Sequence, residues 1–147
     1  MTRRSFKSEL ESLVFVLSSN RNIMINPQAI NVLDDFRRAL SCYRVERIRK
    51  YLIWGLLVGR SLDTFTVFFL ASKGARPIRY FDLRIRRICR QPNPLTSNPA
   101  IQDDLLRIKD KRNELFHNAG RHFSDAEMED FVFTTTKCIT QLLSDLP

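Results

Sequence analysis

A chain of 147 residues, 44% hydrophobic and 27% charged, is long enough for one domain with a buried core, which excludes a wholly disordered protein. Its three cysteines, Cys42, Cys89 and Cys138, are odd in number and far apart, which excludes a disulfide framework and a zinc pattern and favours buried thiols in a reducing cytoplasm. The net charge of +8 is concentrated in residues 1–90, where eighteen Lys and Arg face seven Asp and Glu, so nucleic acid is a better candidate partner than a surface that serves solubility alone.

The first part of the chain predicts two helices separated by a polar break. Apolar residues recur every three or four positions over 5–18, which is the spacing of one helical face. The break runs from Asn20 to Asn26. Asn26 followed by Pro27 is typical of an N-cap and a first helical position, so a second helix is predicted from there to about Ser41.

A long apolar stretch follows and predicts a helix over about 45–72, bent at Gly59 and ended near Gly74. Arg60 and Asp63 lie in its middle, where either charge would be costly in lipid, so a buried core helix is predicted rather than a membrane span. The aromatic and β-branched residues of 65–70 also suit a strand, but no partner strand is predicted.

Three further segments complete the chain. Residues 80–90 predict a helix, and residues 91–100 contain three prolines and predict a loop. A helix is predicted over 99–118, stopped at Ala119-Gly120, and Ser124 with Glu127 forms a capping box that starts a last helix reaching about Leu143. Together these segments predict one all-α domain over 1–147, a bundle of five to six helices.

The segment Arg112 to His117, with sequence RNELFH, concentrates chemically useful side chains on the penultimate helix. Arg112 lies in the same stripe as four apolar residues, so its guanidinium needs a partner or a wet cleft. Asn113 and His117 are four positions apart and share one side of the helix, whereas Arg112 lies about 100° round from Asn113. One copy therefore offers half a site, and a site doubled across a dimer is predicted.

The sequence KRNELFHNAG resembles the signature of the HEPN superfamily, in which an Arg precedes a polar residue and, a few positions on, a His. The resemblance implies a helical bundle that forms a homodimer, with two signature helices facing each other across a basic cleft. It also implies a metal-independent endoribonuclease of the toxin or phage-defence type, with an antitoxin protein as a possible partner. Arg112 and His117 match the two invariant positions, and Asn113 matches the polar one.

These residue types suit RNA cleavage. Arg112 can grip phosphate oxygens, and an imidazole such as that of His117 can move a proton near neutral pH. Asn113 could donate to the phosphate or orient the imidazole. No metal or other cofactor is predicted, because the sequence offers no cluster of carboxylates or histidines to hold one.

Other interpretations of the motif stay open at this point. The chain could be a catalytically silent HEPN-like module that binds RNA, a nucleotide or a protein partner, or an interaction protein in which the motif is accidental. His117 could simply cap the C-terminus of its helix, where the helix dipole favours it, and Arg112 could pair with Asp110 or Glu114. His122 is predicted to be a loop residue. The presence of all three of Arg112, Asn113 and His117 favours the enzyme, since a silent module has no need of an imidazole.

A dense basic run over residues 76–90 is the second candidate site. Read functionally, it is a tract that binds the RNA backbone, with Tyr80 and Phe81 available to stack on bases. Read structurally, it is the charged outer face of a helix whose apolar residues, Phe81 among them, face the core. The smaller cluster of Arg44, Arg47, Arg49 and Lys50 is predicted to be a solvated face. The candidate RNA-binding residues are Arg76, Arg79, Arg84, Arg86, Arg87 and Arg90.

Overall fold

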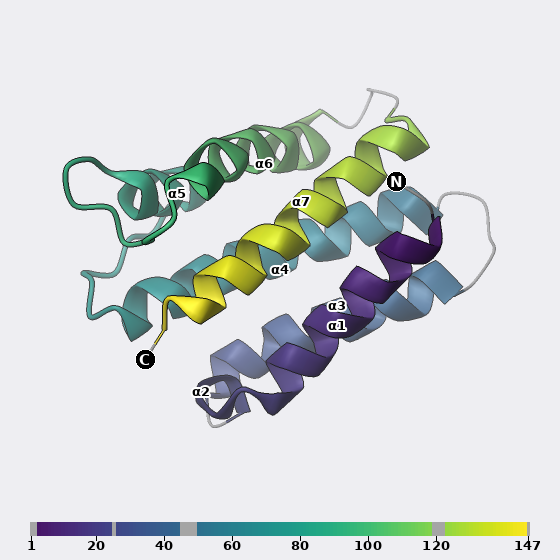
Figure 1. Ribbon diagram of the computed structural model, residues 1–147. Helices are drawn as coiled ribbons and strands as arrows, with labels where there is room; N and C mark the ends of the chain where they lie inside the picture. Colours follow the sequence, from purple (N-terminus) through teal and green to yellow (C-terminus); the bar gives the residue numbers. More distant parts are fainter. Residues whose placement is uncertain (1–2, 25, 45–49, 119–122, 147) are drawn as a thin grey trace.

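A computed structural model describes residues 3–24, 26–44, 50–118 and 123–146, and every regular element within them is an α-helix. This confirms the all-α prediction. Three layers are visible (Figure 1), with α1 and α3 on one side, α4 and α7 in the middle, and α5 and α6 on the other side. The helices are α1 (Arg3–Ser19), α2 (Arg21–Met24), α3 (Pro27–Arg44), α4 (Lys50–Ser72), α5 (Phe81–Cys89), α6 (Ala100–His117) and α7 (Asp125–Ser144).

Several predictions fall on residues that lie outside the described part of the chain. They concern the start of the long helix at 45–49, the stop at Ala119-Gly120 and the loop position of His122. The predictions for the side chains of Cys42 and of the cluster that contains Arg44, Arg47, Arg49 and Lys50 also lie outside it.

The polar break between the first two predicted helices contains one helical turn, α2. The side-chain oxygen of Asn20 accepts a hydrogen bond from the backbone N–H of Ile23 at 3.2 Å, which starts this turn. Asn26 then accepts from the N–H of Ala29 at 3.2 Å, so the predicted N-cap is confirmed and α3 begins at Pro27. Because α3 continues to Arg44, it is longer than the sequence pattern indicated.

Helix α4 is the centre of the bundle and contacts α3, α5, α6 and α7. The prediction of a helix rather than a strand over 65–70 is confirmed, because these residues continue α4, where Phe65 and Phe69 are fully buried. The segment Gly55–Ser72 is apolar and long enough to cross a membrane by length and composition, and 56% of it is buried inside the bundle. Gly74, with φ of 68°, ends the helix as predicted, and the N–H of Ala75 bonds to the carbonyl of Leu70 at 2.9 Å.

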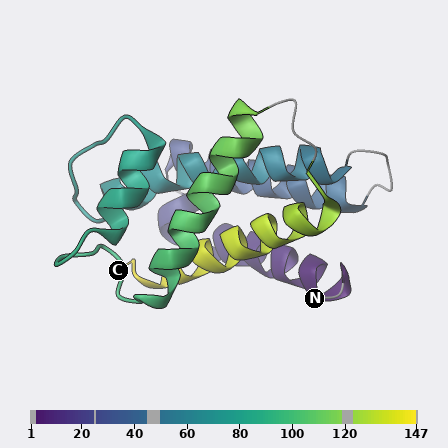
Figure 2. The same cartoon turned by 90° about the horizontal axis from the view of Figure 1, so that it is seen from above.

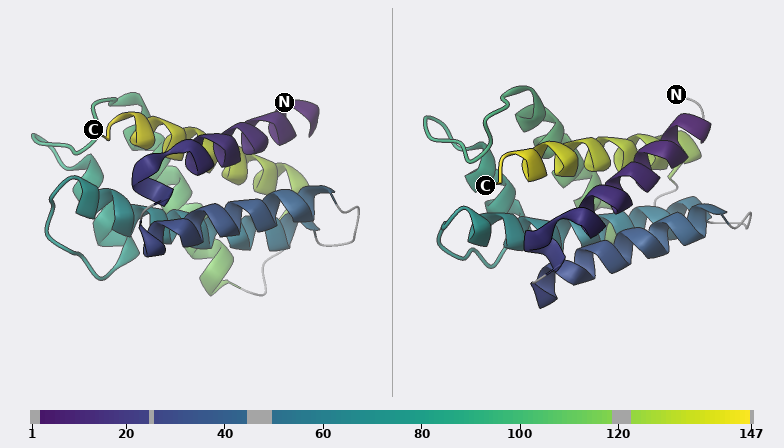
Figure 3. Two further views of the ribbon diagram at one scale, coloured as in Figure 1. Left: turned by 90° about the horizontal axis from the view of Figure 1, so that it is seen from below. Right: turned by 60° about the horizontal axis from the view of Figure 1, so that its bottom comes forward.

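Helix α6 crosses obliquely over α4 and α7 (Figure 2), and α1 and α3 lie on the opposite face of the molecule (Figure 3). The predicted proline-rich loop precedes α6 and is attached to the end of α7, where the carboxylate of Asp145 accepts hydrogen bonds from Thr96 at 2.8 Å and from Ser97. Ser124 accepts from the N–H of Glu127 at 3.1 Å, as expected of the capping box.

Candidate active site

The guanidinium of Arg112 is held between two aromatic rings. Its Cζ atom lies 4.7 Å from the ring centre of Phe81 on α5 and 4.5 Å from that of Phe116 on α6. Cation–π contacts at these distances stabilise a cation best where water is excluded, and the Arg112 side chain is only 14% exposed. The two rings and the buried stem restrict this side chain to one orientation.

Asp63 on α4 is the charged partner that the sequence required for Arg112. Its Oδ2 atom accepts from Arg112 Nη2 at 2.7 Å. The nearby acids Asp110 and Glu114 instead contact Lys109 and Lys111, respectively. Arg112 therefore pairs across the bundle rather than along its own helix. An ion pair at this depth requires good geometry to offset desolvation, and stacking on two rings supplies part of that geometry.

The other oxygen of Asp63 accepts a hydrogen bond from Arg84, a buried residue of α5. Arg84 also donates to the hydroxyl of Thr66 at 2.8 Å and to the carbonyl of Arg79 at 2.7 Å. Burial lowers the pKa of the Arg84 guanidinium; Asp63 opposes that shift and the positive charge of Arg112 adds to it. One carboxylate thus joins two guanidiniums, and this Arg84–Asp63–Arg112 triad ties α4, α5 and α6 together.

Gly59 makes room for this arrangement on α4. A Cβ atom built there would lie 2.8 Å from a ring carbon of Phe116 and 3.4 Å from Cγ of Arg112. Helix α4 runs without interruption from Lys50 to Ser72, so this glycine serves the close approach of α6.

Asn113 is joined to both sides of the site. Its Nδ2 atom donates to Asp82 Oδ1 on α5 at 2.8 Å, and its Oδ1 atom accepts from Arg112 Nη1 at 3.3 Å. The long side chain of Arg112 reaches Asn113 in spite of the 100° that separates the two Cα positions. Asn113 is thereby fixed beside the guanidinium.

His117 is the last residue of α6 and is exposed. Within the described part of the chain its imidazole makes no hydrogen bond or ion pair. A histidine in the last turn also suits the helix dipole. The three predicted residues therefore differ: Arg112 and Asn113 are held within the protomer, and His117 is open to a ligand.

The structure divides the predicted RNA-binding arginines into two groups. Arg84 is 4% exposed and belongs to the triad, so it does not share a surface with the others. Arg76, Arg79, Arg86 and Arg90 are exposed, and Arg87 is half-buried beside the proline-rich loop. Phe81 is a core residue, as the structural interpretation held, whereas Tyr80 is 61% exposed.

Sequence reasoning did not assign five residues of this site, namely Asp63, Asp82, Gly59 and the two rings on Arg112, Phe81 and Phe116. Asp63 carried a signal, because an acid in the middle of a core helix also needs a partner. The identity of that partner depends on how α6 crosses α4, and helical spacing does not contain this information.

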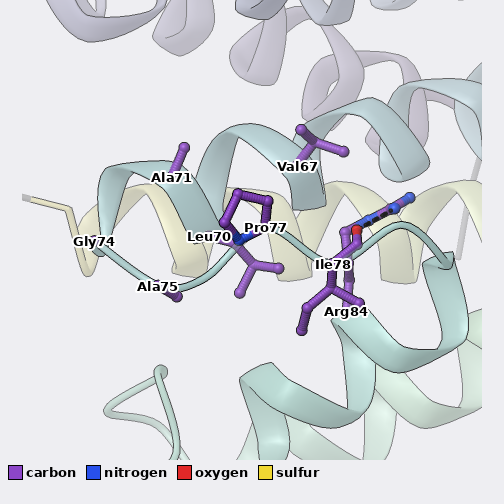
Figure 4. Close-up of a pocket in the computed structure, with 8 residues that line it drawn as sticks. All are labelled: Val67, Leu70, Ala71, Gly74, Ala75, Pro77, Ile78 and Arg84. Atoms are coloured by element: carbon purple, nitrogen blue, oxygen red, sulfur yellow. Dashed lines mark hydrogen bonds between the residues drawn. The ribbon is translucent and has the colours of Figure 1, made fainter.

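One well-defined pocket of the described residues lies outside the motif. A cavity of about 520 Å³ lies between the end of α4 and the segment that follows it (Figure 4), with mainly apolar walls. Arg84 closes one end, where its Nη1 atom donates to the carbonyl of Ile78 at 3.1 Å. Among the residues that the structure describes, no group of three or more His, Cys, Asp or Glu side chains could hold a metal ion.

No protein-family model matches the chain, and neither a curated protein nor a solved structure matches it.

Proposed function

We propose that this protein is a metal-independent endoribonuclease of the HEPN type, acting as a homodimer. The observation that carries the proposal is that one helix presents both an exposed imidazole, His117, and a guanidinium, Arg112, that Asp63 and two rings hold in one orientation. A guanidinium that is already ordered loses little entropy when a phosphate arrives. A free imidazole can exchange protons with substrate.

The proposed reaction uses the nucleophile that RNA itself carries. A base removes the proton of a 2′-hydroxyl, O2′ bonds to the adjacent phosphorus, and the bond from phosphorus to O5′ breaks. The departing O5′ takes a proton from an acid, which leaves a 2′,3′-cyclic phosphate and a 5′-hydroxyl. His117 acts as base or acid, and Arg112 balances the charge that develops on the phosphate oxygens.

Two proton-transfer groups are needed, and each protomer supplies one His117. A second copy placed against α6 would bring its own His117 to the same phosphate, one imidazole acting as base and the other as acid. Phe116 and Leu106 support this placement, because they are 40% and 36% exposed on α6 and offer apolar surface for contact. A toxin or phage-defence role in the cytoplasm, with an antitoxin as regulator, is part of the same proposal.

The test is incubation of the purified protein with total RNA in EDTA, alongside His117→Ala and Arg112→Ala. We expect cleavage by the wild type, cyclic phosphate ends, and loss of cleavage in both variants. His117→Ala is the more informative variant, because His117 is exposed and its removal should leave the fold intact. Cleavage that survives His117→Ala, or that disappears with EDTA alone, contradicts the mechanism.

A silent binding module is the second candidate, and the engagement of Arg112 favours it. A guanidinium that is 14% exposed and already paired has fewer donors left for a phosphate. This candidate predicts that the wild type binds RNA without cutting it and that His117→Ala binds equally well.

A further inference from the structure

The outward face of α5 carries a continuous set of five residues, four exposed and one half-buried, that do not pack in the core. At 100° per residue, its five outward positions fall within an arc of about 120°, and the buried residues Phe81, Ile85 and Ile88 occupy the other side. Helix α5 contacts only α4 and α6 among the described helices and lies at one edge of the molecule (Figure 1). The outward set is Tyr80, Leu83, Arg86, Arg87 and Arg90.

An aromatic ring and an apolar side chain lie within this basic face. Tyr80 is 61% exposed and Leu83 is 48% exposed, and the guanidinium of Arg79 lies 5.5 Å from the Tyr80 ring centre. A large ring left in solvent and flanked by a cation is a platform on which a nucleic-acid base can stack. Core packing does not account for it, because the neighbouring ring, Phe81, fills that role.

Unpaired cations lie at the other end of the same face. Arg90 is exposed and, within the described residues, forms no ion pair; Arg87 donates only to the carbonyl of Asn93, at 3.3 Å. These two arginines line a polar pocket of about 320 Å³ together with Gln91, Pro92 and Asn93. Two guanidiniums and two amides line this pocket without a carboxylate, so its chemistry suits a phosphate group.

The dipole of α5 explains only part of this arrangement. Arg86 and Arg87 are in its last turn, where cations stabilise the carbonyl end. Arg90 is the C-cap residue and can share this role, whereas Tyr80, at the N-cap, cannot. Tyr80 and Arg90 are about 15 Å apart along the helix direction, which exceeds the length of one nucleotide.

We propose that this α5 face binds single-stranded RNA, with a base stacked on Tyr80 and a phosphate in the Arg87–Arg90 pocket. The inference rests on the proposed function and names single-stranded RNA as the substrate class of the proposed enzyme. Stacking on Tyr80 requires an unpaired base, so duplex RNA is excluded. The next two residues, Phe81 and Asp82, contact Arg112 and Asn113, so the end of α5 at which Tyr80 lies is beside the motif.

The test measures binding of a single-stranded 2′-O-methyl RNA, which lacks the attacking hydroxyl and stays intact whether or not the protein is an enzyme. The double variant Arg87→Ala/Arg90→Ala should weaken binding and reduce the slope of log K against log salt by about 0.7, the value for the one phosphate contact that it removes. Tyr80→Ala should weaken binding about tenfold with an unchanged slope, and Tyr80→Phe should restore it.

The matched control is Arg21→Ala/Arg37→Ala, which removes the same charge from exposed positions on α2 and α3. Equal losses in both double variants, no loss in Tyr80→Ala, or duplex RNA bound as tightly as the single strand would overturn the inference. Inorganic phosphate that occupies the pocket as tightly as RNA does would also overturn it. If the wild type binds this RNA through α5 but cuts no natural RNA, the inference stands and the proposed function fails. If the wild type cuts RNA and the α5 variants cut equally well at low RNA concentration, the proposed function stands and the inference about α5 fails.

Discussion

The carboxylate of Asp63 on α4 accepts a hydrogen bond from the guanidinium of Arg112 on α6 at 2.7 Å, across 49 positions of the chain. The same carboxylate accepts from Arg84 on α5, so one acid orders the motif and attaches two helices to the core. The candidate active site and the fold therefore depend on the same contact.

Asp63→Asn should destabilise the protein by about 2 kcal/mol, because two largely buried guanidiniums lose their only carboxylate partner in this triad. Urea unfolding measures the change. The control is Asp34→Asn, which removes a half-exposed carboxylate 3.8 Å from Arg37 and should change stability by less than about 0.5 kcal/mol. Equal changes in the free energy of unfolding for the two substitutions would contradict the proposed contribution of the triad to stability.

Gly59→Ala should impair RNA cleavage more than it impairs folding. The new methyl group meets the Phe116 ring at 2.8 Å, and this 40% exposed ring can swing outward and leave Arg112 uncovered on one face. The helical preference of Ala over Gly, about 1 kcal/mol, offsets part of the steric cost. We expect unfolding within about 1 kcal/mol of wild type and at least a tenfold fall in cleavage measured in EDTA.

Gly74→Ala is the matched control for that substitution. Its φ of 68° disfavours a side chain and should cost about 1 kcal/mol, yet no atom lies within 4 Å of the added Cβ. Cleavage should therefore be unchanged. If both variants lose cleavage activity in proportion to their loss of stability, Gly59 does not affect cleavage through Phe116 and Arg112.

Asp145→Ala should release the proline-rich loop from the end of α7. The loss of two hydrogen bonds to a partly exposed carboxylate should cost about 1 to 2 kcal/mol. Limited trypsin digestion should then cleave after Arg90 several times faster, whereas Asp110→Ala, at an exposed position on α6, should digest like the wild type. An unchanged digestion rate in Asp145→Ala would show that other contacts hold the loop.

Cys89 and Cys138 should resist alkylation in the native protein. Burial raises the pKa of the Cys89 thiol to about 11 and that of Cys138 to about 12, so at pH 8 almost none of either is thiolate. Iodoacetamide labelling, followed by mass spectrometry, should be on the order of 100-fold slower than in urea. Labelling at the same rate in both conditions would show that these thiols are accessible.

The same thiols predict a loss of stability at alkaline pH. Above about pH 9 the unfolded thiols ionise while the folded ones stay neutral, so the unfolded state binds fewer protons and stability falls as pH rises toward 11. Urea midpoints at pH 8, 9 and 10 should therefore decrease, and Cys138→Ala should make the decrease smaller. A slope identical to that of the wild type would exclude Cys138 as a contributor.

Local sequence determined the helices and their ends. Asn26 with Pro27, Gly74 and Ser124 act through backbone bonds within a few residues, so their roles could be predicted from neighbours alone. The segment from Arg112 to His117 was likewise identifiable, because its residue types and spacing are local properties. A one-turn helix such as α2 was missed, since four residues carry too little periodicity to indicate one.

Tertiary structure decided what those side chains contact. The stripe on α6 showed that Arg112 needed a partner, but only the crossing of α6 over α4 selected Asp63 over the local acids Asp110 and Glu114. In the same way, the register of α5 buried Phe81 and Arg84 and left Tyr80 in solvent, although all three belong to one basic, aromatic run. Burial and ion pairing depend on how distant helices meet, and that relation exists only in the folded chain.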